Sequence, residues 1–91
     1  MPRVSARWRS RVLLVQVRNR PAGAMLKVVA LRHGRREFSL RRVAQRTRAA
    51  SSVRMRLPRP PDRVQVQFLD STGNSSSLIE LRRRRKGSYG P

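Results

Sequence analysis

Few side chains in this sequence could carry out catalysis. The chain has no cysteine and a single histidine, His33, which stands between Arg32 and Gly34. A Ser–His–Asp triad or a histidine metal site would depend on that one imidazole, and its position before a glycine is typical of an exposed turn. The lack of cysteine also removes thiolate nucleophiles, disulfides and cysteine zinc sites. We expect no catalytic or metal-binding role for His33.

The carboxylates are also poor candidates for acid–base chemistry. The chain has four acids, and each stands within two residues of an arginine or in an expected turn: Glu37, Asp62, Asp70 and Glu80. A nearby guanidinium lowers the pKa of a carboxyl group and favours an ion pair over proton transfer. A glycine-rich phosphate loop is absent as well. We therefore expect a protein that is not an enzyme and that uses no metal and no cofactor.

Positive charge is the dominant chemical feature of the chain. Its 91 residues include 23 Lys plus Arg against 4 Asp plus Glu, a net charge of +19, and only Lys27 and Lys86 are lysines. The planar guanidinium fork fits phosphate and carboxylate. Contacts to phosphates release counterions, so such a chain gains affinity for any nucleic acid without reading its bases. Solubility alone requires a net charge of about 2–8 in a small domain, so +19 predicts a polyanionic partner.

The cations of greatest interest lie at the two ends of the chain and on one alternating segment. Five consecutive cations occupy residues 82–86, and arginines recur through residues 3–11. We expect these residues to contact phosphates, with one tryptophan and one tyrosine available to stack on bases. The candidate nucleic-acid-binding residues are Arg3, Arg7, Trp8, Arg9, Arg11, Arg54, Arg56, Arg82, Arg83, Arg84, Arg85, Lys86 and Tyr89.

The elements that position these residues are predicted to be strands. Residues 53–57 and 64–68 alternate strictly between apolar and polar side chains, which is typical of half-buried strands. The segment between them contains three prolines and predicts a loop. Further strands are expected at 11–18, 24–33, 37–43 and 77–82, with Phe38 and Leu40 inward, while 44–52 is expected to be a loop or a single helical turn. Asp70 to Asn74 is the clearest hairpin turn.

The predicted fold class is all-β: a small antiparallel sandwich or barrel with basic N- and C-terminal arms. We expect a basic arm at residues 1–10, a single β domain at 11–82 and a flexible basic tail at 83–91. Like charges in that tail repel one another and favour disorder until an anion neutralises them. The first 36 residues contain no acid, as in mitochondrial transit peptides, but their alternation favours a strand over an amphipathic helix.

Part of the chain resembles a bacterial immunoglobulin-like module. The resemblance covers about residues 36–82 and consists of an alternating strand at 64–69, then Asp70-Ser71-Thr72-Gly73-Asn74-Ser75-Ser76, then a last alternating strand at 78–81. It implies an immunoglobulin-like fold in which Asp70, Gly73 and Asn74 serve the turn. No catalytic residue is implied.

These features predict a non-enzymatic, arginine-rich structural protein that binds a polyanion. The few aromatic residues argue against base stacking on a sheet, and no helix suits the DNA major groove. RNA is favoured over DNA, with the protein embedded in a ribonucleoprotein such as a ribosome. A small immunoglobulin-like component of a virion or another large assembly is the alternative, ahead of anionic membrane surfaces and acidic proteins. We expect no membrane span and an intracellular location, in the cytoplasm or an organelle matrix, unless the protein is part of a virion.

Overall fold

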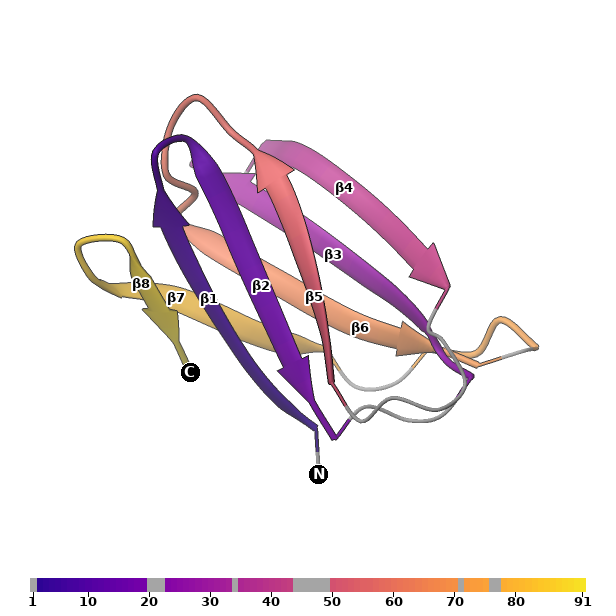
Figure 1. The fold of residues 1–91 in the computed structure, drawn as a ribbon. Coiled ribbons are helices and arrows are strands. Elements are labelled where there is room, and N and C mark those ends of the chain that lie inside the picture. The colour runs from indigo at the N-terminus through magenta and orange to yellow at the C-terminus, as the bar shows by residue number, and fades with distance from the viewer. Residues whose placement is uncertain (1, 20–22, 34, 44–49, 71, 76–77) are drawn as a thin grey trace.

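The described residues fold into eight β-strands that form one sheet, as seen in a computed structural model (Figure 1). The structure describes residues 2–19, 23–33, 35–43, 50–70, 72–75 and 78–91. The strands are β1 (Arg3–Arg9), β2 (Val12–Arg18), β3 (Met25–Arg32), β4 (Arg35–Val43), β5 (Ala50–Arg56), β6 (Arg63–Leu69), β7 (Ile79–Arg85) and β8 (Ser88–Gly90).

The order of the strands across the sheet is β4-β3-β6-β7-β8-β1-β2-β5, and every neighbouring pair is antiparallel. The sheet curls on itself, so that β1, β2 and β5 lie in front of β3, β4 and β6 (Figure 1). Strands β4 and β5 are the two ends of the sheet. The expected all-β, antiparallel class is confirmed, and the arrangement is a curled half-barrel.

Alternation of apolar side chains explains which face of the sheet is buried. Successive side chains of a strand point to opposite faces, so every second residue can enter one core. The inward apolar residues of β2, β5 and β6 are all almost fully buried: Leu13, Val15, Val17, Val53, Met55, Val64, Val66 and Phe68. Leu26, Val28 and Ala30 of β3 and Leu81 of β7 complete much of the same cluster. The strands predicted from alternation therefore form as expected.

The expected N-terminal arm is wrong, because residues 3–9 form β1. This strand pairs with β2 along its whole length, from Arg3 opposite Arg18 to Arg9 opposite Val12. Ala6 is buried, and Val4 and Trp8 pack against the core. The arginines point outward, where water solvates their charge, so they do not prevent the strand from forming.

The expected flexible tail is also wrong, because residues 79–90 form β7 and β8 in the same sheet. Residues 82–86 are all exposed, so solvent screens the repulsion between their charges. Tyr89 is buried with the core, and β8 pairs with both β7 and β1. Burial of one aromatic ring thus fixes this strand in the sheet.

Two smaller expectations also need correction. Phe38 was expected to face the core, but its side chain is 41 % exposed, since β4 ends the sheet and has a neighbour on one side only. The expected loop at 44–52 is shorter, because β5 begins at Ala50; residues 44–49 lie outside the described residues, as does the side chain of Leu40. The proline loop between β5 and β6 is confirmed.

Candidate nucleic-acid interface

The outer face of β1, β2 and β5 carries arginine on both sides of β2. Arg7 of β1 and Arg54 of β5 are both paired with Leu14 of β2. Paired residues of antiparallel strands lie on the same face, and adjacent strands are about 4.8 Å apart. The backbones at Arg7 and Arg54 are therefore about 10 Å apart across the sheet, with the half-buried Leu14 between them.

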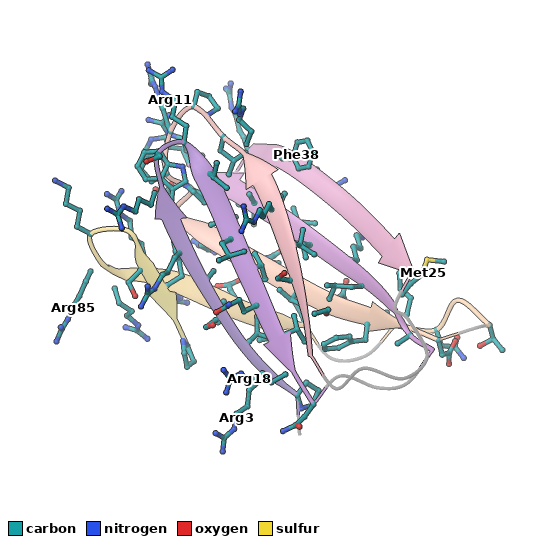
Figure 2. The ribbon with its side chains drawn as sticks, viewed as in Figure 1. Arg3, Arg11, Arg18, Met25, Phe38 and Arg85 are labelled. Atoms are coloured by element: carbon teal, nitrogen blue, oxygen red, sulfur yellow. The ribbon has the colours of Figure 1, made fainter. Side chains whose placement is uncertain are left out.

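The same arrangement repeats along the three strands. Arg9 and Arg56 are both paired with Val12, and at the other end of the hairpin Arg3 is paired with Arg18. In Figure 2, Arg3 and Arg18 lie at one end of the β1–β2 hairpin and Arg11 lies at the other. The outward arginines of β1, β2 and β5 are all exposed: Arg3, Arg7, Arg9, Arg18, Arg54 and Arg56. Positive charge thus extends over the full length of this face.

The C-terminal strands extend one row of this face. Arg7 is paired with Ser88 of β8, which is paired in turn with Arg85 of β7. One row therefore runs across five strands in the order Arg85, Ser88, Arg7, Leu14, Arg54. A register shift between Arg83 and Arg85 puts Arg85 opposite Ser88. The candidate cations of the N-terminus, of β5 and of the C-terminal run are thereby brought together.

The other members of the C-terminal run have different surroundings. Lys86 lies in the turn between β7 and β8, and Arg83 lies opposite Tyr89. A guanidinium nitrogen of Arg84 donates a hydrogen bond to the carbonyl of Pro91. These side chains are exposed but do not share the row that Arg85 joins.

The carboxylate of Glu80 lies on a different part of the sheet. It is 3.8 Å from the Nη1 of Arg63 and 3.6 Å from the Nε of Arg82, and it accepts a 3.1 Å hydrogen bond from Nε2 of Gln65. The Gln65 hydrogen bond, with the charges of the two arginines, lowers the pKa of Glu80. Arg82 is thus partly neutralised, whereas no ion pair among the described side chains involves the outward arginines of β1, β2 and β5.

The other two described acids stabilise turns. Oδ2 of Asp62 accepts a 2.6 Å hydrogen bond from the backbone N–H of His33, whose Nδ1 lies 3.6 Å away. Asp70 accepts hydrogen bonds from the hydroxyl and N–H of Thr72 and from the N–H of Asn74, and the Thr72 hydroxyl contributes most to lowering its pKa. The exposed turn position expected for His33 is confirmed. Its imidazole side chain is 77 % exposed.

Neither aromatic candidate lies free on the surface. Trp8 is half-buried against the core, and its indole N–H donates a 3.4 Å hydrogen bond to the carbonyl of Leu57. Tyr89 is only 4 % exposed, and its hydroxyl donates a hydrogen bond to the carbonyl of Pro61. Burial raises the pKa of Tyr89 to about 12. The expectation that Tyr89 stacks on a base is wrong, because its ring belongs to the core.

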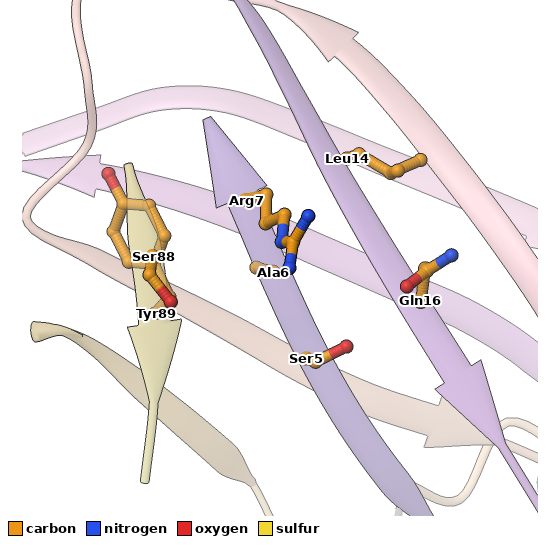
Figure 3. A pocket seen from close by; sticks show the side chains of 7 residues that line it. All are labelled: Ser5, Ala6, Arg7, Leu14, Gln16, Ser88 and Tyr89. Carbon is orange, nitrogen blue, oxygen red and sulfur yellow. The ribbon is translucent and has the colours of Figure 1, made fainter. Parts of the chain in front are cut away.

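A hollow of about 330 Å³ opens on the outer face between β8, β1 and β2 (Figure 3). The lining residues are Ser5, Ala6, Arg7, Leu14, Gln16, Ser88 and Tyr89. Ser5, Arg7, Leu14, Gln16 and Ser88 alternate with buried neighbours and so lie on the outer face. The hollow therefore combines one guanidinium with two hydroxyls, one amide and one apolar side chain.

Sequence reasoning missed five polar residues on this face: Ser5, Gln16, Arg18, Ser52 and Ser88. The alternation of apolar and polar residues could have identified two of them. In the expected strand at 11–18, Gln16 and Arg18 fall opposite to the apolar residues and so must point outward. Ser5, Ser52 and Ser88 lie in segments that were not expected to be strands, so no strand periodicity was applied to them.

Comparisons with known proteins identify no relative: no family model, no curated protein and no solved structure matches the chain. In the described part of the chain, no helix is long and apolar enough to span a membrane. Within the same residues, no group of three or more His, Cys, Asp or Glu side chains could hold a metal ion. The geometry and charge of the outer face are therefore the basis for a functional interpretation.

Proposed function

We propose that this protein is a non-enzymatic structural protein that binds the phosphate backbone of RNA through the outer face of β1, β2 and β5. The observation that carries the proposal is the pairing of Arg7 and Arg54 with Leu14, repeated by Arg9 and Arg56 with Val12. This face presents six outward arginines and no described carboxylate. Such an array attracts a chain of phosphates and is not neutralised within the protein.

The chemistry of this face suits the backbone of a nucleic acid and not its bases. The described outward side chains of the three strands are arginine, serine, glutamine, leucine and valine. Sequence readout on a sheet relies on aromatic side chains that stack on bases, and the outer face has none among its described residues. Binding by charge and shape suits a protein embedded in a large folded RNA, so we place this protein in a ribonucleoprotein such as a ribosome.

A salt titration of RNA binding tests the proposal. With about six phosphates engaged, raising the salt from about 50 to 200 mM should weaken binding by several hundredfold to a thousandfold. The double variant Arg7→Gln/Arg54→Gln should lower affinity and reduce the slope of log K against log salt by about two. The matched control is Arg35→Gln/Arg36→Gln, which removes the same charge at the start of β4, at the far end of the sheet.

The control separates local contacts from net charge. If both double variants weaken binding equally, only the total charge matters, and the outer face of β1, β2 and β5 is not the interface. If wild-type binding does not respond to salt, the protein does not bind a phosphate backbone. Circular dichroism of each variant verifies that the sheet is intact.

A structural role in a virion or another protein assembly is the second candidate. The strands divide into β5-β2-β1 and β4-β3-β6-β7, with β8 joining β1 to β7. Constant-type immunoglobulin sandwiches place strands A, B, E and D in one sheet and C, F and G in the other. The groups β1, β2, β5 and β3, β6, β7 match A, B, E and C, F, G, whereas β4 lies beside β3. This grouping supports the immunoglobulin-like assignment that such assembly modules share. Co-sedimentation with ribosomal subunits favours the first function, whereas incorporation into protein particles without RNA favours the second.

A further inference from the structure

The row of paired residues Arg85, Ser88, Arg7, Leu14 and Arg54 is called the arginine row below. The hollow on the outer face lies within this row and not beside it. Arg7 lines it, and the row continues to Arg85 through Ser88 on one side and to Arg54 through Leu14 on the other. A nucleic-acid strand whose phosphates follow this row must therefore pass over the hollow. The volume of about 330 Å³ is at the small end of ligand sites, which span about 300–1,000 Å³.

The side chains in the hollow are chemically different from those that surround it. Arg7 is the one cation in its lining and can form two parallel hydrogen bonds to a phosphate. Ser5, Gln16 and Ser88 are neutral and can both donate and accept hydrogen bonds. In Figure 3, the side chains of Ser5, Arg7 and Gln16 lie on the same side of the two neighbouring strands β1 and β2. All three residues are exposed.

Ser5, Gln16 and Ser88 would recognise a neutral group that both donates and accepts hydrogen bonds. The 2′-hydroxyl of ribose has this property, and it distinguishes RNA from DNA. Ser5 and Gln16 are directly paired across β1 and β2, so their polar groups approach the same point of the strand. Leu14, two residues before Gln16, offers an apolar surface for the carbons of the sugar ring.

We propose that this hollow holds one ribose-phosphate unit of bound RNA, with Arg7 on the phosphate and with Ser5, Gln16 and Ser88 on the 2′-hydroxyl. The proposal rests on the proposed function, because it assumes that the arginine row binds a nucleic-acid backbone. It adds that the protein prefers RNA to DNA, and that uncharged residues cause the preference.

The test compares two oligonucleotides that differ only in the 2′-hydroxyl: oligouridine and oligodeoxyuridine of about 12 nucleotides. Fluorescence anisotropy at fixed salt should show that the wild-type protein binds oligouridine about five- to tenfold more tightly, as expected for one or two neutral hydrogen bonds. The variant Ser5→Ala/Gln16→Met, which keeps the charge and nearly the side-chain volume, should lose this preference. Its salt slope should stay unchanged.

Two further variants check the assignment of roles. Arg7→Gln should weaken binding of both oligonucleotides and lower both salt slopes by about one, because it removes a phosphate contact. Ser75→Ala removes a hydroxyl in the loop between β6 and β7, and it should leave the preference unchanged. Melting temperatures of all variants verify that they fold.

The outcomes separate this inference from the proposed function. Steep, salt-dependent binding with equal affinity for the two oligonucleotides overturns the ribose site and leaves backbone binding in place. A preference that persists in Ser5→Ala/Gln16→Met also overturns it. If neither oligonucleotide binds, the proposed function itself fails.

Discussion

The hydroxyl of Tyr89 donates a hydrogen bond to the backbone carbonyl of Pro61, and this contact ties the last strand of the chain to the loop before β6. Both side chains are buried. Strand β8 lies between β7 and β1, so it joins the two groups of strands into one sheet. The basic C-terminal segment is therefore part of the folded structure, and removing it would divide the sheet.

The ionisation of Tyr89 tests this burial directly. It is the only tyrosine, so the ultraviolet absorbance of tyrosinate reports this residue alone. Burial raises its pKa from 10.0 to about 12. The folded state thus favours the neutral phenol. The contribution of this preference to the free energy of unfolding is complete below pH 10 and is lost between pH 10 and about 12. A spectrophotometric titration should give a midpoint near 12 for folded protein; a midpoint near 10 would mean that the ring is exposed.

Alternation was sufficient to predict the inner strands, because one buried face determines which residues point inward. Val64, Val66 and Phe68 follow this pattern strictly, and all three are buried. Strand β1 was missed although Val4, Ala6 and Trp8 alternate in the same way, because Arg3, Arg7 and Arg9 suggested a solvated arm. The pattern of burial, and not the charge, decides whether such a segment joins a sheet.

The arrangement of the site depends on strand order, which local sequence does not encode. Arg7 and Arg54 are 47 positions apart in the chain and share Leu14 as a partner only because β2 lies between β1 and β5. Strand β8 is three residues long, too short to show a period, and the hydroxyl of Tyr89 donates its hydrogen bond to the carbonyl of Pro61, 28 positions earlier. These are long-range contacts, so the sequence supplied the candidate cations but not their grouping.

The turn between β7 and β8 should require glycine. Gly87 has a φ of +76°, its carbonyl accepts a 2.9 Å hydrogen bond from the N–H of Trp8, and a Cβ there would lie 2.7 Å from the carbonyl oxygen of Trp8. We expect Gly87→Ala to lower the free energy of unfolding by more than the 1–3 kcal/mol or so that backbone strain alone costs. Denaturant unfolding followed by the fluorescence of the single tryptophan measures the loss.

Gly73→Ala is the matched control for that substitution. Gly73 also has a positive φ, +91°, but no atom lies within 4 Å of an added Cβ. It should therefore show the cost of strain without the clash at Trp8. Equal losses for the two variants would mean that the β7–β8 turn moves away from β1 at little cost.

The free energy of unfolding should fall in acid, partly because the Glu80 carboxylate becomes protonated. Its pKa is below the ordinary 4.5 because Gln65, Arg63 and Arg82 favour the carboxylate. The unfolded chain then binds the proton more readily than the folded one, so this contribution is present above pH 4.5 and is lost as the pH falls through the lower, folded pKa. Glu80→Gln should reduce the decrease in denaturant midpoint between about pH 6 and 3. An unchanged pH profile would show that the ion pairs are too solvated to matter.

A polyanion should stabilise the folded protein beyond the effect of salt. The net charge of +19 opposes compaction, and the outward arginines of β1, β2 and β5 have no described acidic partner. A ligand at a hundred times its dissociation constant contributes about 2.7 kcal/mol, which corresponds to a rise in melting temperature on the order of 10 °C for a domain of this size.

Thermal melts with RNA and with sodium chloride at equal ionic strength distinguish specific binding from screening. Arg7→Gln/Arg54→Gln should lose part of the gain from RNA and little of the gain from salt. A protein that melts at high temperature alone, with no additional gain from RNA, would be a self-sufficient structural module, and its charge would then require another explanation.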